Sequence, residues 1–302
     1  MTNHKHLRLV IEDIYSKNNQ LTEDLAFKLI NEFRYSNLYI PAKRENYELN
    51  FVIYEDEDFK ITPLFTDLDE FNKFFKNDTD IEIMQNPFEV YQNILKSSDL
   101  EGYILNPSSE KYLFRKEFIL SIKNIPKTNY FALDAYSTDE LKNMKNHPNE
   151  NLENFIKNPN NIGNFEGLFE EFSKSNILTL MVSDVDLTTY ATGGVISMTD
   201  SGPLAQMHVD KVGGEYATIF SSEDKIKEVK TDKFKYSQVV NLSMLVNFVL
   251  SEDMDGIILN LDSDDVLISR QTLLKYSLGF EKYVNDERLC ESIYYMFLIE
   301  WS

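Results

Sequence analysis

The sequence predicts an α+β protein built from two tandem copies of a small mixed β-sheet unit with flanking helices. Three observations predict this fold class. An apolar segment with a central glycine occurs twice, two further segments recur in the same order, and helical and strand-like apolar patterns alternate within each copy. The chain has 302 residues, of which 42% are hydrophobic and 13% aromatic, so each copy is long enough to bury its own core.

The duplication is visible as pairs of matching segments at nearly constant separation. LEGYILNPSS (100–109) matches MDGIILNLDS (254–263) at a separation of 154 residues, and the match continues on both sides. Phe65 in ITPLFTDLDEF (61–71) matches Phe220 at a separation of 155. NEFRYSNLYI (31–40) matches EEFSKSNILT (170–179) at a separation of only 139. Three collinear matches indicate a duplication. The growing separation places a net insertion in the second copy, within 180–214.

The predicted elements follow the same order in each copy. An amphipathic helix comes first, with apolar positions at Leu25, Leu29 and Phe33, and at Phe165, Leu168, Phe169 and Phe172. Strands are expected at 38–41 and 177–182, and in the first copy also at 48–55 and 60–65, where Pro63 predicts an edge or a bulge. Thr66 with Asp69, and Ser221 with Asp224, resemble capping boxes that start a helix. Helices at 87–97 and 241–251 and central strands at 102–106 and 256–260 follow, and a short strand and helix close each copy.

Two helices are expected outside the repeat. One carries an apolar stripe of Leu7, Val10, Ile11, Ile14 and Tyr15. The other is capped by Asn285 and is apolar nearly all round from Leu289 to Trp301, which is typical of a buried helix. The expected organisation is a first repeat over 1–123, a polar linker with short helices over 124–163, and a second repeat with its insertion and C-terminal helix over 164–302.

Composition narrows the classes of partner. The net charge of −20 disfavours nucleic acid and anionic lipid, and favours a basic protein. The acids cluster in corresponding parts of the two copies: residues 51–100 hold 12 acids and 4 bases, and residues 251–302 hold 11 and 4. One cysteine excludes an internal disulfide and a multi-cysteine metal site.

With no signal peptide and no membrane-spanning stretch, the expected location is the cytoplasm.

The first copy resembles the SseB-like family, named for enhanced serine sensitivity. The resemblance lies in LYIPAK (38–43), ITPLFTDLDEF (61–71) and LEGYILNP (100–107), and covers about residues 25–122. In the second copy Pro41 and Pro107 are replaced by Leu180 and Leu261, and Pro63 has no counterpart. The resemblance implies a binding or accessory module and supplies no established catalytic residue to carry over. The residues of the shared motif are interpreted as structural: Thr66, Asp67, Gly102, Asn106, Pro107, Gly256 and Asn260.

Residues able to carry chemistry are few. His4, His6, His147 and His208 are not placed beside a nucleophile, and Cys290 is expected to be buried and inert. Gly193-Gly194 is interpreted as a hairpin turn in the insertion. Asp184 and Asp186, or Asp262, Asp264 and Asp265, carry oxygen ligands but lack the spacing of an EF-hand loop. We therefore expect no catalytic residue, no cofactor and no metal.

The remaining candidate is an acidic surface. Glu55, Asp56, Glu57 and Asp58 form the turn between two predicted strands, and Asp253 and Asp255 add charge in the second copy. Such charges steer association with a basic partner, although runs of charge also occur simply on solvated faces. The leading hypothesis is a non-catalytic protein-binding adaptor. One alternative is an immunity protein that neutralises a cationic toxin such as a nuclease. Another is an unrecognised enzyme or small-ligand binder that uses a cleft between the copies.

Overall fold

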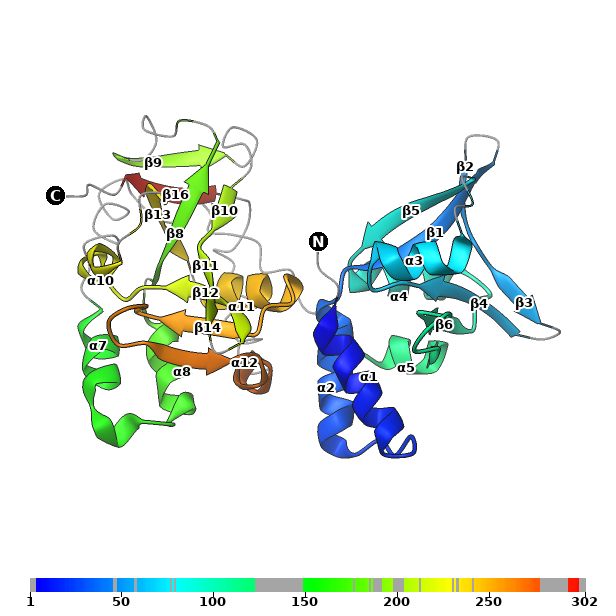
Figure 1. Ribbon diagram of the computed structural model, residues 1–302, viewed down its shortest axis with the longest axis horizontal. Coiled ribbons are helices and arrows are strands. Elements are labelled where there is room, and N and C mark those ends of the chain that lie inside the picture. The colour runs from blue at the N-terminus through cyan, green and yellow to red at the C-terminus, as the bar shows by residue number, and fades with distance from the viewer. Residues whose placement is uncertain are drawn as a thin grey trace. The chain divides into compact units, whose positions relative to one another are not determined.

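A computed structural model of the chain confirms the α+β class with two similar sheet units (Figure 1). The structure describes residues 4–122 and 149–298, apart from gaps at 46–47, 57–58, 77, 79, 176, 185, 187–191, 198–203, 212, 230, 232–233, 241 and 278–292. Two compact units are present. The first is Met1–Ile125 with Leu250–Asp253, and the second is Pro126–Val249 with Met254–Ser302.

The first unit alternates helices and strands in the predicted order. Its elements are α1 (Lys5–Ser16), α2 (Glu23–Tyr35), β1 (Leu38–Glu45), β2 (Glu48–Phe51), β3 (Tyr54–Asp56), β4 (Phe59–Leu64), α3 (Leu68–Phe75), β5 (Ile81–Asn86), α4 (Phe88–Ser97), β6 (Gly102–Leu105), β7 (Tyr112–Arg115) and α5 (Lys116–Ser121). One sheet has the order β2-β1-β5 and the other β3-β4-β6-β7. A bridge between Tyr39 and Phe65 joins the two sheets through reciprocal backbone bonds of 2.8 and 2.9 Å.

Strand alternation gives these sheets two apolar sides. The main core lies on the side that faces α1, α2, α4 and α5, and includes Leu38, Ile40, Leu64, Tyr103 and Leu105. The opposite side carries α3, whose rings pack on Tyr39 and Phe65. In α1, Leu7, Val10, Ile11 and Ile14 are buried in the main core, whereas Tyr15 remains 40% exposed.

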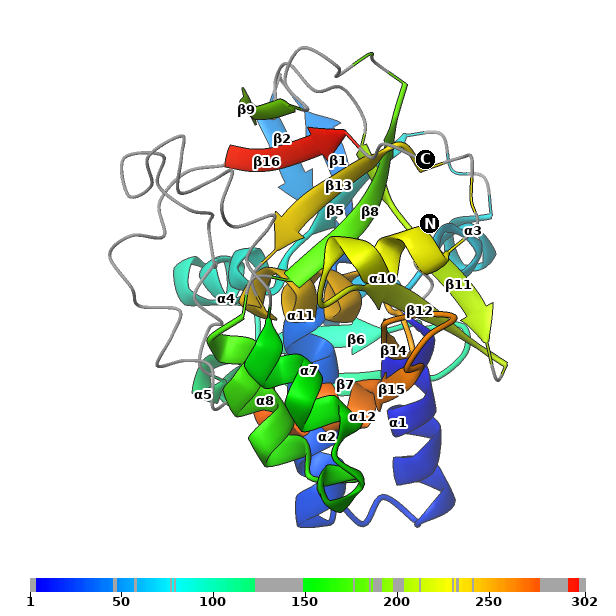
Figure 2. The same cartoon turned by 90° about the vertical axis from the view of Figure 1, so that its left-hand side faces the viewer.

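The second unit repeats this arrangement and extends it (Figure 2). Its elements are α7 (Glu150–Lys157), the 3₁₀ turn η2 (Pro159–Asn161), α8 (Phe165–Ser173), β8 (Ile177–Ser183), β9 (Thr192–Ser197), β10 (Leu204–Gln206), β11 (His208–Lys211), β12 (Gly214–Ile219), α10 (Glu223–Glu228), β13 (Tyr236–Val240), α11 (Leu242–Ser251), β14 (Gly256–Leu259), β15 (Val266–Ser269), α12 (Arg270–Ser277) and β16 (Ile293–Leu298). The sheet orders are β10-β8-β13-β16-β9 and β11-β12-β14-β15.

The pairing patterns show that the two units are copies. The parallel pair β4–β6 corresponds to β12–β14, and the bridge of Tyr39 to Phe65 corresponds to that of Leu178 to Phe220. In the first unit β1 and β2 form a hairpin, whereas in the second β8 and its partner β10 are separated by residues 184–203. The insertion therefore lies between β8 and β10 and carries β9. Strand β9 pairs with β16, and β16 pairs with β13.

The C-terminal helix predicted after Asn285 is wrong over 293–298, where the structure has strand β16. An apolar run has no periodicity that separates a buried helix from a buried strand. The segment IYYMFL is rich in residues that favour strands, and pairing on both sides satisfies its backbone. Asn285 itself and Cys290 lie outside the described residues.

The turn predicted at Gly193-Gly194 is also wrong, because both glycines lie inside strand β9. Thr192 pairs with Phe297 and Val195 with Tyr295, so the two glycines together oppose Met296. Two residues opposite one define a β-bulge, where glycine is common because the bulged backbone bends.

Other expectations differ in detail. Asp67, not Thr66, caps α3 by accepting from the Glu70 amide, and Ser222 takes the N-cap position of α10.

Strands β5 and β13 were not expected from the sequence. Of the expected linker, 149–163 is described, and there α7 packs against α8 as α1 packs against α2. Strand β4 pairs with β3 only through residues 59–61, so Pro63 has β6 alone as a neighbour. This fits proline, which has no amide hydrogen to donate to a second strand.

Candidate functional site

Asn106 organises the loop that follows the central strand of the first unit. Its backbone is left-handed at φ 43°, and its side chain is fully buried. The Oδ1 atom accepts from the Thr66 amide at 3.0 Å, and Nδ2 donates to Thr66 Oγ1 at 3.0 Å and to Glu110 Oε2 at 2.8 Å. The amide of Asn106 donates to the Leu64 carbonyl at 2.9 Å. One asparagine thus ties the ends of two parallel strands together.

Asn260 makes the same set of bonds in the second unit. Its φ is 56° and it is fully buried. Oδ1 accepts from the Ser221 amide at 2.8 Å, and Nδ2 donates to Ser221 Oγ at 3.0 Å and to Asp264 Oδ2 at 2.8 Å. The motif residues Thr66, Asn106 and Asn260 therefore form an internal lock in each unit.

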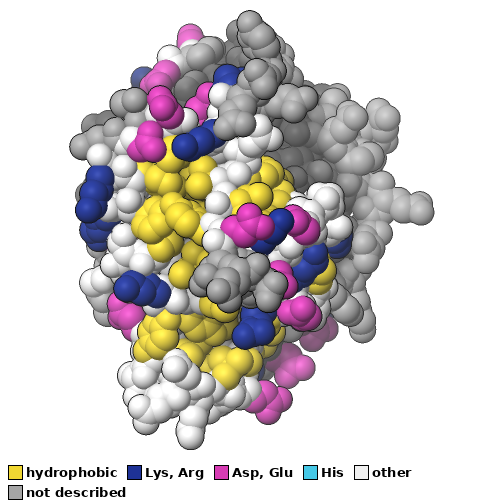
Figure 3. All heavy atoms as spheres, turned by 90° about the vertical axis from the view of Figure 1, so that its right-hand side faces the viewer, with side chains coloured by type: hydrophobic (Ala, Val, Ile, Leu, Met, Phe, Trp, Pro, Cys, Tyr) yellow, Lys and Arg dark blue, Asp and Glu magenta, His cyan; other side chains and the backbone are white. Residues whose placement is uncertain are grey.

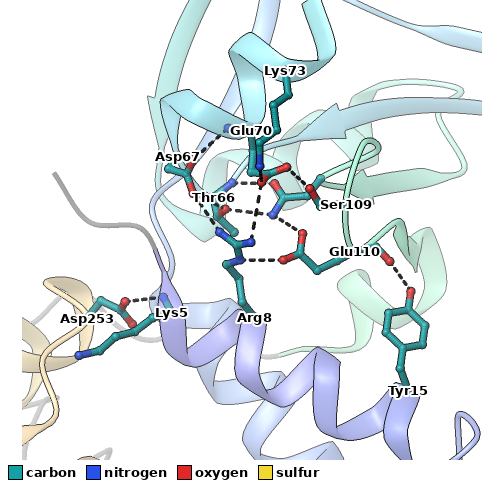
Figure 4. Close-up of polar contacts among 11 residues, drawn as sticks. Lys5, Arg8, Tyr15, Thr66, Asp67, Glu70, Lys73, Ser109, Glu110 and Asp253 are labelled. Carbon is teal, nitrogen blue, oxygen red and sulfur yellow. Dashed lines mark hydrogen bonds and ion pairs between the residues drawn. The ribbon is translucent and has the colours of Figure 1, made fainter. Parts of the chain in front are cut away.

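A charged cluster surrounds this lock in the first unit (Figure 4). Arg8 of α1 lies 2.7 Å from Glu110, 3.4 Å from Asp67 and 3.7 Å from Glu70. The Glu70 side chain is only 1% exposed, and it also contacts Lys73 and Ser109 at 2.5 Å. Hydrogen bonding to Glu70 raises the pKa of Lys73. These carboxylates hold α1 in place.

The second unit has an equivalent cluster in which two positions carry the opposite charge, whereas Asp264 keeps the negative charge of Glu110. Glu153 of α7 occupies the place of Arg8 and accepts from Ser221 Oγ at 2.9 Å. Lys225 occupies the place of Glu70, contacts Ser263 and lies 3.2 Å from Asp264. Burial raises the pKa of Glu153, but hydrogen bonds from Ser221, Ser222 and Lys157 outweigh it and hold the pKa below its usual value. Because every charge in both clusters has an internal partner, we assign them to structure.

Sequence reasoning missed these charged residues. Glu110 and Asp264 are aligned acids just beyond the segments 100–109 and 254–263; Asp264 was considered only as a possible metal ligand, and Glu110 was not singled out. Arg8 and Glu153 lie on α1 and α7, which were placed outside the repeat, and no sequence signal linked them.

The motif glycines allow a close approach between strands. A Cβ on Gly102 would lie 2.3 Å from the Phe114 carbonyl oxygen, and one on Gly256 would lie 2.1 Å from that of Ile268. No side chain fits at either position, so both glycines serve the β6–β7 and β14–β15 pairs. Pro107 follows Asn106 and is partly buried at the strand exit.

The predicted acidic surface is only partly present. Glu55 in β3 is exposed and pairs with Lys60 at 3.0 Å, and Asp56 ends that strand. Glu57 and Asp58 lie outside the described residues. Asp253 is 6% exposed, so it does not belong to an exposed acidic surface. Asp255 accepts from the Glu215 amide at 2.7 Å and begins strand pairing in the second unit. Both aspartates belong to turn structure that sequence alone does not reveal.

An apolar stripe remains open on the side of the first unit that carries α3. Tyr54 pairs with Ile61, and Ile104 pairs with both Pro63 and Leu113, so these side chains share one face of the sheet. Tyr54 is 40% and Leu113 36% exposed, and Ile61 and Ile104 are partly exposed. Figure 3 shows apolar side chains gathered on one face of the molecule, with charged groups around them. We call Tyr54, Ile61, Ile104 and Leu113 the open face.

The equivalent face of the second unit is closed. Tyr216 and Ile258 stand at the positions of Ile61 and Ile104, and both are buried in one core cluster with Leu180, Phe220 and Val239. Val209 and Leu267, at the positions of Tyr54 and Leu113, pack against that cluster. The difference between the units is therefore specific to this face.

Among the described residues, the histidines and aspartates considered above do not form a catalytic or metal site. His4 is buried and its Nε2 lies 3.0 Å from the Asn37 carbonyl oxygen. His6 is the second residue of α1, and His208 pairs with Glu215 at 3.3 Å. Asp264 and Asp265 contact Lys225 and Lys211, and Asp184, Asp186 and Asp262 are exposed. Across the described ranges, no group of three or more metal-ligating side chains is found. His147 falls in the undescribed segment 123–148.

Comparisons with known proteins add little. No family model matches this chain, and no curated protein is similar to it. Among solved structures, Tic22 from Plasmodium falciparum aligns with 85% of this chain and 99% of its own, at 10% identity and a TM-score of 0.17. A TM-score this low supports no inference about fold or function. Within residues 4–298, gaps aside, no helix has both the length and the apolar character needed to cross a bilayer.

Proposed function

We propose that this chain is a non-catalytic protein-binding module and that the open face of its first unit is the contact surface. One observation carries the proposal: the second copy of the same fold buries this face, whereas the first copy leaves Tyr54 and Leu113 exposed. Contiguous exposed apolar side chains mark interaction sites on soluble proteins. Aromatic residues such as Tyr54 are enriched at the centres of protein interfaces.

The surroundings of the open face favour a basic partner. The Glu55 side chain, next to Tyr54, is 61% exposed. Burial and the nearby carboxylate of Asp78 raise the pKa of Tyr54, which places a second acid beside the ring. Residues 51–100 hold 12 acids against 4 bases. An apolar centre with an acidic rim fits a protein surface that is apolar in the middle and basic at its edge. This proposal agrees with the binding role that resemblance to the SseB-like family implies.

The test compares two variants in affinity capture from an extract of the source cells. Tyr54→Ser with Leu113→Ser removes apolar area from the open face. Ile162→Ser is the matched control, because Ile162 is 84% exposed but stands alone in the second unit. We expect a basic protein that the wild type and the control retain and the double variant loses. Equal retention by all three proteins would show that the open face is not the contact surface.

A further inference from the structure

Strand β5 forms an edge of its sheet in the first unit. The sheet order is β2-β1-β5, and β5 pairs with β1 in antiparallel register from Leu38 opposite Asn86 to Lys43 opposite Ile81. No other strand pairs with β5 among the residues that the structure describes. Such an edge presents unpaired backbone groups to an incoming strand.

The equivalent strand in the second unit has a neighbouring strand at this edge. Strand β13 corresponds to β5 and pairs with β8 as β5 pairs with β1. Tyr39 corresponds to Leu178, because each bridges to the equivalent phenylalanine, so Gln85 corresponds to Val239 and Ile83 to Ser237. The other side of β13 is occupied by β16, with Ser237 opposite Phe297 in antiparallel register (Figure 2). Among the residues described, no strand lies beside β5 at this position.

Backbone directions identify which amides of β5 point outward. The amide and carbonyl of Tyr39 bond to Phe65, and the Pro41 carbonyl accepts from Val52, so both residues point away from β5. Antiparallel strands alternate, so the bonded pairs of β1 with β5 are those of Leu38, Ile40 and Ala42. Their partners Asn86, Met84 and Glu82 face β1. The amides of Ile81, Ile83 and Gln85 therefore face the open edge.

Side chains beside this edge define the chemistry of the occupant. Ile81 and Ile83 pack against the cluster of Tyr39, Phe65 and Phe71, as do Phe74 and Phe75, and together they offer an apolar surface to a neighbouring strand. The preceding acids Asp78 and Asp80 are exposed. In the second unit the strand at this position is IYYMFL. A matching segment has aromatic and aliphatic residues along an extended stretch, with basic residues at its ends.

We propose that the open edge of β5 binds an extended segment of a partner protein in antiparallel orientation, as β16 adds to β13. The inference rests on the proposed protein-binding function and names its mode. Backbone bonds to Ile83 and Gln85 supply register, and the phenylalanine cluster supplies apolar contact. The edge and the open face meet at Phe74, whose ring contacts Tyr54 at 5.5 Å between centroids, so the separating variant is made at Leu113 in β7, at the opposite edge of that sheet from β3.

The experiment uses the full chain and a synthetic peptide of sequence KKIYYMFLKK, which carries the β16 strand between lysines. We expect the peptide to slow amide hydrogen exchange at Ile83 and Gln85. Exchange at Met84, already bonded to β1, stays unchanged. The control peptide KKPYPMPLKK has prolines at the positions of Ile293, Tyr295 and Phe297, which face the neighbouring strand in the register of Ser237 opposite Phe297, so it cannot form the ladder. Protection at β13 in place of β5, or equal effects of both peptides, would overturn the proposal.

Variants of Ile83 test the edge directly. Ile83→Pro removes an outward amide and leaves the bonds to β1 intact, whereas Ile83→Val keeps the amide. We expect the proline variant to bind the peptide at least about tenfold more weakly, since one backbone bond is lost, and the valine variant to bind as wild type. If the proline variant does not fold, Gln85→Pro takes its place. Unchanged peptide binding by a folded proline variant would contradict the proposal.

Two further readouts separate this inference from the proposed function. A face variant with Leu113→Ser alone should bind the peptide normally, because Leu113 lies in β7, at the opposite edge of its sheet from Tyr54, and takes no part in the ladder. Retention of the captured partner by the Ile83→Pro variant, with loss in the face variant, would refute the edge alone. A concentration-dependent dimer in sedimentation, abolished by Ile83→Pro, would show that the edge pairs with a second copy and would overturn the proposed occupant.

Discussion

At the scale of single residues, the two asparagines after the central strands do most to define each unit. Asn106 and Asn260 combine a left-handed backbone with three side-chain bonds in a fully buried site. Asparagine tolerates the left-handed region better than other residues with a side chain, and its amide both donates and accepts. Few other residue types meet both demands, which explains why the motif recurs at both positions.

Replacing Asn106 by alanine should lower the free energy of unfolding by about 3 kcal/mol, because the buried amide of Thr66 loses its acceptor and alanine is strained at positive φ. Asn106→Gly keeps the backbone freedom and should cost about 2 kcal/mol. Urea unfolding of both variants measures the two contributions. Equal losses for both would show that backbone conformation contributes little, and losses under about 0.5 kcal/mol would contradict the lock altogether.

The buried tyrosines predict a loss of stability at high pH. The Tyr103 hydroxyl donates to the Tyr91 carbonyl at 2.9 Å, and burial raises the pKa of Tyr103 well above its usual range. The folded state therefore favours the neutral phenol, and the stability that this provides is present below about pH 10 and is lost as pH rises further. Unfolding free energies from pH 7 to 11 should fall more steeply for the wild type than for Tyr103→Phe. Parallel curves would be inconsistent with this account.

At the scale of elements, the first helix of each unit is fastened by charges of opposite sign. In the first unit Arg8 of α1 meets carboxylates that include Glu70, and in the second Glu153 of α7 lies in a cluster that includes Lys225. α1 packs against α2, and α7 packs against α8. The two units thus have this helix packing in common and differ in the sign of the charge on the first helix. The charge on the helix and the charge on the segment that it contacts therefore differ between the two units together.

A double-mutant cycle tests this polarity. Arg8→Glu should cost about 3 kcal/mol in the free energy of unfolding, because it adds a carboxylate to buried ones. Glu70→Lys places a cation near Arg8 and should also destabilise. The double variant reproduces the polarity of the second unit, so its loss should be smaller than the sum of the single losses by at least about 1 kcal/mol. Additive losses in urea unfolding would show that the two positions are not coupled.

Much of the fold followed from the sequence because periodicity and repetition agreed. The helices at 88–97 and 242–251 and the strands at 102–105 and 256–259 lie where both signals placed them. Strand β5 was not expected because its sequence, IEIMQN, is short and follows charged residues. Apolar and polar residues alternate only once in it, at Ile81-Glu82-Ile83, which is too little to indicate a strand. Strand β16 was read as a helix because its apolar run carries no period. The charged clusters combine residues far apart in sequence, and no local pattern contains that information.

At the scale of the whole molecule, charge governs how partners approach. The chain carries a net charge of −20, with acids concentrated in residues 51–100 and 251–302. Long-range attraction of a basic partner raises the rate of association and weakens as salt screens it. In the proposed complex the open face contributes short-range contacts, and such contacts mainly set the dissociation rate. Kinetic measurements on an identified partner therefore separate the two contributions.

Replacing Glu55, Asp56, Glu57 and Asp58 by serine should slow association with a basic partner and reduce its salt dependence, while the free energy of unfolding stays within about 0.5 kcal/mol. The control replaces four exposed acids of the second unit, Glu166, Glu170, Asp224 and Glu228. It removes the same charge elsewhere. Association rates at several salt concentrations provide the measurement. Identical rates and salt slopes for wild type and variant would mean that this turn does not steer binding.

The reversed polarity of the two clusters also matters while the chain is folding. Tandem copies of one fold can exchange equivalent elements and become trapped in misassembled states. If α1 docked on the second unit, Arg8 would face Lys225, and if α7 docked on the first, Glu153 would face Glu70 in a buried site. The second exchange is the less favourable one, because Glu70 is only 1% exposed and two carboxylates out of water repel each other. We therefore expect the charge at this one position to favour docking of each helix on its own copy.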